Sequence, residues 1–398
     1  MTPQFINSPN QSTQLKLRGY FTFTLSFLLN RIDMEIYVMI LLFLKATPME
    51  HWQKALNKSL IGLEELARLF HLDIEPLRPV VEHYPMKITR YYLSLIKQPG
   101  DPIWLQCMPD ARELEDDHLS TDPLNENGFT PVPGLIHRYP DRVVLLVSSA
   151  CPTHCRFCLR KHRLGSWQPL DRDEGLKYIE GNRDIRDVIL SGGDPFMLSD
   201  EVLKDILERL KKISHVEMIR INTRIPVVFP GRITFRLCHM LRHYHPIYVN
   251  THFNHPSEIT PESAAACVRL ADAGIALGNQ TVLLRGVNDD PAVMKKLMQK
   301  LLTLRVRPYY IHQMDLVKGT GHFRTPVGRG LKIMSGLRGH TSGMATPYYM
   351  IDLPGGKGKV PILPDDVKRK GETIFLRNYL GEVVEYPGDG GWGETELT

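Results

Sequence analysis

Three of the six cysteines in the chain lie within eight residues, in the segment SSACPTHCRFCLRKHR. They are Cys151, Cys155 and Cys158, so their spacing is C-x3-C-x2-C. Clustered cysteines of this kind bind zinc or an iron–sulfur cluster, or they form disulfides. A zinc site takes four ligands, and the fourth would have to be His154 or His162. Three thiolates on a four-iron cluster would instead leave one iron open, able to bind a small molecule and pass it an electron.

The number of cysteines argues against disulfides. Six cysteines among 398 residues are too few for a secreted disulfide scaffold. The other three, Cys107, Cys238 and Cys267, stand alone in the sequence, and we expect them to be small buried apolar side chains. A reducing compartment follows, so we predict a cytoplasmic protein.

Charge and hydropathy predict neither a nucleic-acid partner nor a membrane span. The formal charge of +5 is small for this length, and the basic residues are scattered. In residues 1–48 the apolar run IYVMILLFL has nine residues, whereas about 20 are needed to cross a bilayer. We expect this stretch to be a disordered leader or a mis-assigned start. An amphipathic membrane anchor is the alternative.

The strands and helices that would position the cysteines are predicted from a regular alternation of apolar runs and helix-like segments. Six short apolar runs (VVLLV, DVILS, EMIRIN, IYVNT, TVLL and PYYIH) alternate with helix-like segments. This pitch predicts parallel βαβ units. Six units fall short of the eight of a complete barrel, so we predict a partial, laterally open α/β barrel. A doubly wound sheet is the alternative, although no G-x-G-x-x-G follows the first run.

The chain divides into four parts by its patterns. Residues 50–98 have helical periodicity, and residues 99–136 are rich in Pro, Asp and Asn, as in a connecting loop. The predicted parts are a leader (1–48), a helical region with its loop (49–136), the barrel (137–348) and a C-terminal segment (349–398).

Polar residues and glycines gather at the ends of the predicted strands. The cysteines follow the first strand, SGGDP the second, NTR the third, THFNH the fourth and QMDLVKGTGHFR the sixth. Active sites of parallel α/β folds lie at the carboxyl ends of the strands, so these segments predict one site. In SGGDP, two glycines allow backbone amides to approach a ligand closely.

The cysteine spacing directly after a barrel strand is typical of the radical S-adenosylmethionine (SAM) superfamily. More closely, residues 49–387 resemble the lysine 2,3-aminomutase family. The segments that carry the resemblance are PVPGLIHRYPDRVVLLV, CRFCLRKHR, VILSGGD, RIPVVFPGRIT, NTHFNHPSEIT, LGNQTVLLRGVND, RPYYIHQMDL, GHFRTPV, LRGHTSGMATP and DLPGGKGKVP.

This resemblance implies three cofactors and assigns residues to each. A [4Fe–4S] cluster would be bound by Cys151, Cys155 and Cys158. SAM would be bound by Gly192, Gly193, Asp194, His252 and Gln280. Pyridoxal 5′-phosphate (PLP) would be carried on Lys359 and lined by Arg138, Tyr139 and Arg142. Lys357 stands where the family usually has glycine, so two lysines compete, and their position in the motif favours Lys359.

The resemblance also implies the substrate and the reaction. Arg160 would hold the carboxylate of an amino acid through its bidentate fork. Asp315 and Asp352 would bind the ε-ammonium of lysine, and two aspartates would repel an acidic side chain. The expected reaction converts L-lysine to L-β-lysine through a 5′-deoxyadenosyl radical and amino migration on PLP. An aminomutase for arginine or glutamate and a non-catalytic zinc or iron–sulfur protein are the alternatives.

Departures from the family pattern set further expectations. Asp290 follows GVND where relatives carry a cysteine, and the tail GDGGWGETELT has none, so we expect no structural zinc. His312 stands where the lysine enzymes usually show tyrosine. Expected partners are an amino-acid substrate, a reductant such as flavodoxin or ferredoxin, and further copies of the chain in a homo-oligomer.

Overall fold

The computed structural model describes residues 48–57, 62–116, 118–164, 170–364, 366–370 and 373–386. The chain divides into two compact units, Met1–Ala55 and Leu56–Thr398. The leader expected over residues 1–48 lies outside the described residues except for its last position, and the tail GDGGWGETELT lies outside them entirely.

Strands in the described residues form a nine-stranded sheet whose order follows the sequence from β1 to β9. Neighbouring strands from β2 to β8 are parallel, whereas β1 and β9 pair antiparallel at the two edges. The strands are β1 (Leu135–Tyr139), β2 (Arg142–Ser148), β3 (Asp187–Gly192), β4 (Met218–Asn222), β5 (Ile247–Thr251), β6 (Ala276–Leu283), β7 (Val306–Gln313), β8 (Tyr348–Asp352) and β9 (Lys359–Pro361).

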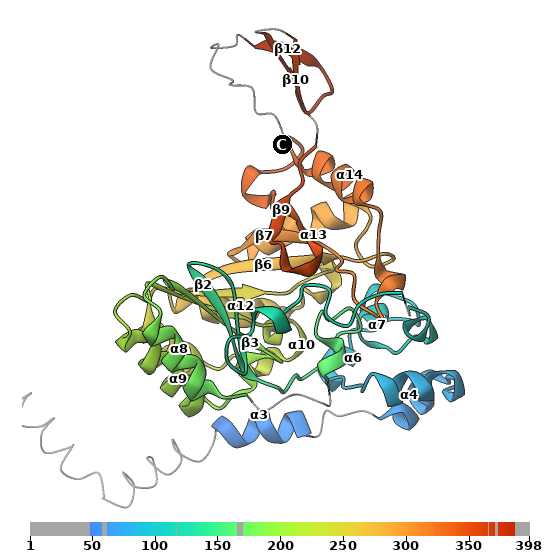
Figure 1. Ribbon diagram of the computed structural model, residues 1–398. Helices are drawn as coiled ribbons and strands as arrows, with labels where there is room; N and C mark the ends of the chain where they lie inside the picture. The colour runs from blue at the N-terminus through green and yellow to red at the C-terminus, as the bar shows by residue number, and fades with distance from the viewer. Residues whose placement is uncertain are drawn as a thin grey trace, which may run out of the picture. The chain divides into compact units, whose positions relative to one another are not determined.

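Helices follow the parallel strands, as right-handed βαβ crossovers require. They are α8 (Arg172–Gly181), α9 (Asp200–Lys212), α10 (Ile225–Val228), α11 (Phe235–Leu241), α12 (Pro261–Asp272), α13 (Pro291–Thr303) and α14 (Val327–Leu337). In Figure 1, α8 and α9 lie next to each other, and an ion pair joins Asp173 of α8 to Arg209 of α9.

Local sequence explains where these helices begin. Helix α9 starts after Ser199, whose hydroxyl accepts a hydrogen bond from the Val202 amide, and it buries Leu203, Ile206 and Leu210 against the sheet layer. Helix α13 starts after Asp290, whose carboxylate accepts from two amides of the first turn. The residue that departs from the family pattern after GVND is therefore a helix cap in this chain.

Shorter elements flank the barrel on both sides in sequence. Before it come α3 (Pro48–Asn57), α4 (Leu63–Phe70), α5 (Arg78–His83), α6 (Arg90–Leu93) and α7 (Pro102–Cys107). After it, a three-stranded antiparallel sheet contains β10 (Val367–Lys370), β11 (Thr373–Arg377) and β12 (Val383–Tyr386). Helix α7 lies within the predicted connecting loop, where Asp101 caps it and Pro102 occupies its first position.

The predicted α/β architecture with a parallel sheet is confirmed, and all six predicted strands are present. The structure adds β8 as a seventh parallel strand. It also starts β6 at Ala276, five residues before the predicted run TVLL, so Gln280 lies inside the strand rather than ahead of it. Gly278 and Asn279 have low strand propensity, so the sequence pattern did not predict that the strand begins before them.

No helix of the described residues is long and apolar enough to cross a membrane.

Candidate active site

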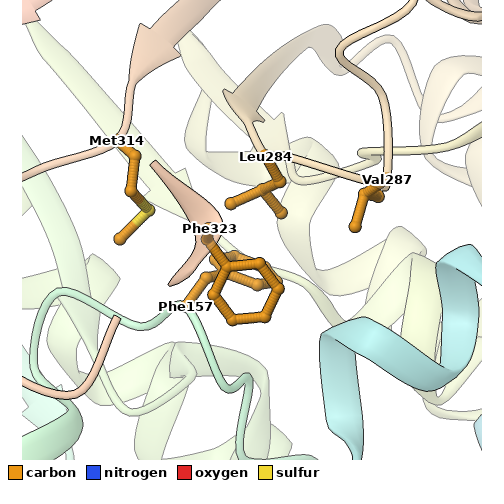
Figure 2. Packing of buried hydrophobic residues seen from close by; sticks show 5 residues of the cluster. All are labelled: Phe157, Leu284, Val287, Met314 and Phe323. Atoms are coloured by element: carbon orange, nitrogen blue, oxygen red, sulfur yellow. The ribbon is translucent and has the colours of Figure 1, made fainter. Parts of the chain in front are cut away.

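The cysteine loop follows the carboxyl end of β2 and is fixed by apolar packing. Phe157, between the second and third cysteines, is 3% exposed and packs with Leu284, Val287, Met314 and Phe323. Figure 2 shows this cluster, in which the loop after β2 meets the segments that follow β6 and β7. The rings of Phe157 and Phe323 lie edge to face with centroids 6.3 Å apart. The loop is thus held against two neighbouring strand ends.

A buried ion cluster holds the same loop from its other side. The Glu113 carboxylate accepts hydrogen bonds from Arg156 and Lys161, and all three side chains are at most 1% exposed. Lys161 also donates to the Gly319 carbonyl at 2.6 Å and lies over the Tyr84 ring. Two buried cations need this one carboxylate, so Glu113 is an essential anchor of the loop.

Three free thiols are presented by this loop, each partly exposed. Burial raises the pKa of Cys158 to about 11 and the pKa of Cys151 well above its usual range. Thiols in such surroundings ionise only against a strong positive charge, which iron ions supply. Cys155 already receives a hydrogen bond from a guanidinium, because Nη1 of Arg224 lies 2.7 Å from its sulfur. The donor set fits a [4Fe–4S] cluster bound through three thiolates.

The predicted SGGD segment packs directly against the start of the cysteine loop. Its glycines are required there, because a Cβ on Gly192 would lie 2.2 Å from the Ser148 carbonyl oxygen and one on Gly193 would lie 2.4 Å from that of Ala150. Gly192 also has φ of +129°, which side chains rarely adopt. The glycines thus allow β3 to pack against the start of the cysteine loop, and their predicted approach to a ligand stays a prediction.

Asp194 has a structural partner set within this turn. Its buried carboxylate accepts hydrogen bonds from the Thr223 hydroxyl and from the amides of Phe196 and Arg224. Burial raises the pKa of Asp194 to about 6. The side chain thus links the ends of β3 and β4, and its predicted contact with SAM stays a prediction.

His252 lies just past β5 and offers a nitrogen to the site. Burial, together with Arg224 and His312, lowers the pKa of His252 to about 3, so the ring is neutral. Its Nε2 atom is buried without a hydrogen-bond partner among the described residues. A buried polar atom of this kind requires a ligand or water. This fits the predicted contact with SAM. Gln280 lies at the bulge of β6, and its role stays a prediction.

Asp352, the last residue of β8, is the centre of a second group of side chains. Its Oδ2 accepts a hydrogen bond from Lys359 Nζ at 2.5 Å and lies 3.4 Å from His312 Nδ1. Its Oδ1 is 4.0 Å from Arg138. Burial alone would raise the pKa of Asp352, but the His312 contact and Lys359 lower it to about 2. The group is therefore a carboxylate at every ordinary pH, and it already binds a primary ammonium.

Asp315, two residues past β7, completes this acidic site. Burial, followed by the charge of Asp352, raises the pKa of Asp315 to about 7. Because Asp352 stays ionised, its negative charge favours the protonated form of Asp315. The charge of Asp352 thus acts on Asp315, and the joint binding of an ammonium by the two residues stays a prediction.

Residues of β1 and β2 lie next to Lys359. The Lys359 amide donates to the Tyr139 hydroxyl at 3.0 Å, and the Arg142 guanidinium lies 3.8 Å from the centre of the Tyr139 ring. Arg138 donates to the Leu124 carbonyl at 2.9 Å, while its Nε is buried without a hydrogen-bond partner among the described residues.

The loop ahead of Lys359 is pressed against the segment before β1. A Cβ on Gly356 would lie 2.4 Å from Phe129, and the residue has φ of +77°. Lys357 and Lys359 are both exposed, and the Lys359 amine donates a hydrogen bond to Asp352. Cationic groups, a lysine amine and a close-packed glycine loop are what a phosphate-bearing aldehyde requires, so these residues fit PLP.

Glu126 was missed in the sequence and lies in the site. Its carboxylate accepts two hydrogen bonds from Arg160, with Nε–Oε2 at 3.0 Å and Nη2–Oε1 at 2.6 Å, and Arg163 lies 3.3 Å away. Burial would raise the pKa of Glu126, but Arg160 and Arg163 lower it. Only its place in the polar segment TDPLNEN pointed to it. Arg160 has five N–H groups, so three stay available for a substrate carboxylate.

Comparisons with known proteins agree with this geometry. The family model of the radical SAM superfamily matches residues 145–297, and that of lysine-2,3-aminomutase matches residues 334–393. The L-lysine 2,3-aminomutase of Fusobacterium nucleatum is 49% identical over 84% of this chain and 81% of that protein. That of Clostridium subterminale is 48% identical over 84% and 83%. The glutamate 2,3-aminomutase of Clostridioides difficile is 44% identical over 84% and 81%.

The parallel sheet and the three-cysteine loop at its carboxyl edge define a radical SAM enzyme. Identities near one half over most of both chains narrow this class further. The chain belongs to the lysine 2,3-aminomutase family, whose members are isomerases that move an amino group. With membership come a [4Fe–4S] cluster, SAM and PLP.

Proposed function

We propose that this chain is an L-lysine 2,3-aminomutase, which moves the amino group of lysine from C2 to C3. The observation that carries the proposal is the acidic site at the ends of β7 and β8. Asp352 binds the primary ammonium of Lys359 at 2.5 Å. The negative charge of Asp352 also contributes to the raised pKa of Asp315. A lysine side chain presents the same ammonium group to the same pair of carboxylates.

Each end of the substrate has its own binding group in this arrangement. Arg160 holds the α-carboxylate through the N–H groups that Glu126 leaves available, and Glu126 fixes the plane of the guanidinium. Asp315 and Asp352 hold the ε-ammonium. With both ends bound, C2 and C3 of the substrate are held between the cysteine loop and Lys359. The hydrogen that reacts is then kept next to a single reaction partner.

When bound, the three cofactors supply the one-electron reduction, the hydrogen transfer and the delocalisation of the unpaired electron. The residues of the chain position and enclose them. Cys151, Cys155 and Cys158 hold the cluster, the Gly192–Gly193 turn and His252 hold SAM, and Lys359 holds PLP. Phe157 and its apolar neighbours exclude water from the cluster side of the site.

An aminomutase for another amino acid is the alternative, since a relative acts on glutamate. The two carboxylates disfavour glutamate, because its side chain would add a third negative charge. Arginine is cationic but longer. His312, 3.4 Å from Asp352, stands where the lysine enzymes usually show tyrosine, so it does not by itself favour lysine over arginine.

A competition assay tests the substrate. Lysine, arginine and glutamate at equal concentration are offered to the anaerobically reconstituted protein, and the β-amino acids are quantified by mass spectrometry. We expect β-lysine to exceed the other two products by at least about tenfold, because a misplaced charge costs more than 1.4 kcal/mol. A preference for glutamate or arginine would contradict the proposed substrate and leave the family assignment intact.

Lys359 is expected to be the lysine that carries PLP. Both lysines are exposed, but the amine of Lys359 donates a hydrogen bond to Asp352 in the site. Borohydride reduction of the PLP-loaded protein, followed by peptide mapping, should place the adduct on Lys359. Lys359→Ala should abolish the adduct and Lys357→Ala should retain it. An adduct on Lys357 in the unaltered protein would refute this prediction.

Further properties belong to the same proposal. We infer a cytoplasmic enzyme, supported by six cysteines without a disulfide. An external one-electron donor such as flavodoxin or ferredoxin would reduce the cluster. A homo-oligomer is supported by exposed apolar side chains near the C-terminal sheet, among them Leu380, Val383 and Val384. The four-part division at residues 48, 136 and 348 stays a prediction.

A further inference from the structure

Arg224 has no role in the binding scheme above, yet it contacts the cysteine loop directly. It follows β4 and is 7% exposed. Its Nη1 lies 2.7 Å from the sulfur of Cys155.

The remaining donors of Arg224 are bound by three other segments. Its Nη2 donates to Glu258 at 2.8 Å and to Gln106 at 2.6 Å, and it lies 2.9 Å from the Tyr92 hydroxyl. Its backbone amide donates to Asp194 at 2.8 Å. The guanidinium therefore has a fixed position, set by α6, α7 and the segment after β5, and Cys155 receives a donor of fixed direction.

Glu258 carries the opposite charge in this network. It is fully buried, and its second oxygen accepts from the amides of Asn254 and His255. The Arg224–Glu258 pair is thus a buried dipole whose positive end faces the cysteine sulfur. Its orientation is held by backbone groups rather than by solvent.

A dipole of this orientation acts on the electron that a cluster accepts. Reduction adds one negative charge to the iron–sulfur unit, and hydrogen bonds to its sulfurs and nearby positive charge stabilise that state. The electron comes from an external one-electron donor, and the Cys155–iron bond neither forms nor breaks in the step. A positive group at the sulfur therefore raises the reduction potential, and a buried negative group lowers it.

We propose that Arg224 is a positioning residue that orients Cys155 and raises the reduction potential of the cluster, with Glu258 opposing it in charge while holding it in place. The proposal rests on the assignment of Cys155 as a cluster ligand. The proposal predicts that replacing Arg224 lowers the reduction potential of the cluster and that replacing Glu258 raises it. A purely structural role would not produce shifts of opposite sign.

Anaerobic redox titration of the full-length, cluster-loaded protein tests this. Dithionite is added with mediators, and the reduced cluster is followed by electron paramagnetic resonance. Arg224→Gln should decrease the ratio of reduced to oxidised cluster at a fixed poise by at least tenfold, which is about 59 mV for one electron. Glu258→Gln should increase that ratio. Arg224→Lys, which keeps the charge but cannot span all the partners, should fall between the parent protein and Arg224→Gln.

Arg220→Gln is the matched control. Arg220 lies in β4, the strand that Arg224 follows, and it forms a partly buried ion pair with Asp187 at 2.5 Å, at the other end of β3. The Arg220→Gln variant should leave the reduction potential of the cluster unchanged. If Arg224→Gln does not fold, Arg224→Lys and Glu258→Gln decide between the outcomes.

The outcomes separate this proposal from the assignment on which it rests. A bound cluster whose potential is the same in the parent and all variants would overturn the role of Arg224 alone. Shifts of the same sign for Arg224→Gln and Glu258→Gln would also overturn it. A parent protein that binds no cluster would overturn the cysteine assignment, and the role of Arg224 with it.

Discussion

Cys155→Ala should remove the iron–sulfur absorbance and reduce aminomutase activity to background. The reason is that three thiolates are the whole protein ligand set of such a cluster, so one loss leaves two irons without a protein ligand. Alanine also leaves the Arg224 guanidinium without its sulfur partner in a buried place. The measurement is the visible spectrum and iron content after anaerobic reconstitution, followed by an assay with lysine.

Cys267→Ala is the control for this variant. Cys267 lies in α12, is fully buried, and burial raises its pKa to about 12. It is a small apolar side chain away from the cysteine loop, so both absorbance and activity should persist. Equal loss in the two variants would refute the assignment of the cluster to the loop after β2.

Much of the fold could be predicted from the sequence because its strands are short apolar runs. VVLLV and IYVNT have the branched and aromatic residues that buried parallel strands favour, and both are strands β2 and β5. The start of β6 was not readable. Its residues Gly278 and Asn279 serve close packing and side-chain hydrogen bonds: a Cβ on Gly278 would lie 2.4 Å from Asn250 Oδ1, and Asn279 bonds Thr251 and Phe253.

The candidate site was readable only where a motif marks it. The cysteines, Asp315, Asp352 and Lys359 all lie in segments that match the family, and Lys359 donates a hydrogen bond to Asp352. Glu113 and Glu126 carry no such mark, and Glu258 lies in the matching segment NTHFNHPSEIT without any local sign of its arginine partner. Each is a buried carboxylate that meets an arginine between 34 and 43 residues away along the chain. Partners this distant leave no periodic or local signal, so charge pairing of this kind needs the coordinates.

Asp352→Asn should decrease kcat/KM for lysine by roughly 30- to several thousand-fold, because truncating one partner of a buried charge contact costs about 2–5 kcal/mol. The amide keeps the shape of the side chain but cannot neutralise the ε-ammonium. Cluster absorbance and SAM binding should stay near those of the parent protein, since Asp352 contacts His312, Lys359 and Arg138 rather than the cysteine loop. Steady-state kinetics with lysine and a separate SAM-binding measurement check both parts.

The KM for lysine is expected to depend on pH, and this dependence tests the role of the two aspartates. Asp315 has a pKa raised to about 7, so below neutral pH it is protonated until an ammonium arrives, and lysine binding must then release a proton. The KM for lysine should therefore rise by up to about tenfold for each pH unit below 7. Asp315→Asn should abolish this dependence. Asp352→Asn should retain it but move it to lower pH, because the charge of Asp352 contributes to the raised pKa of its neighbour. A KM for lysine that is independent of pH between 5 and 8 in the parent protein would contradict the role of the pair.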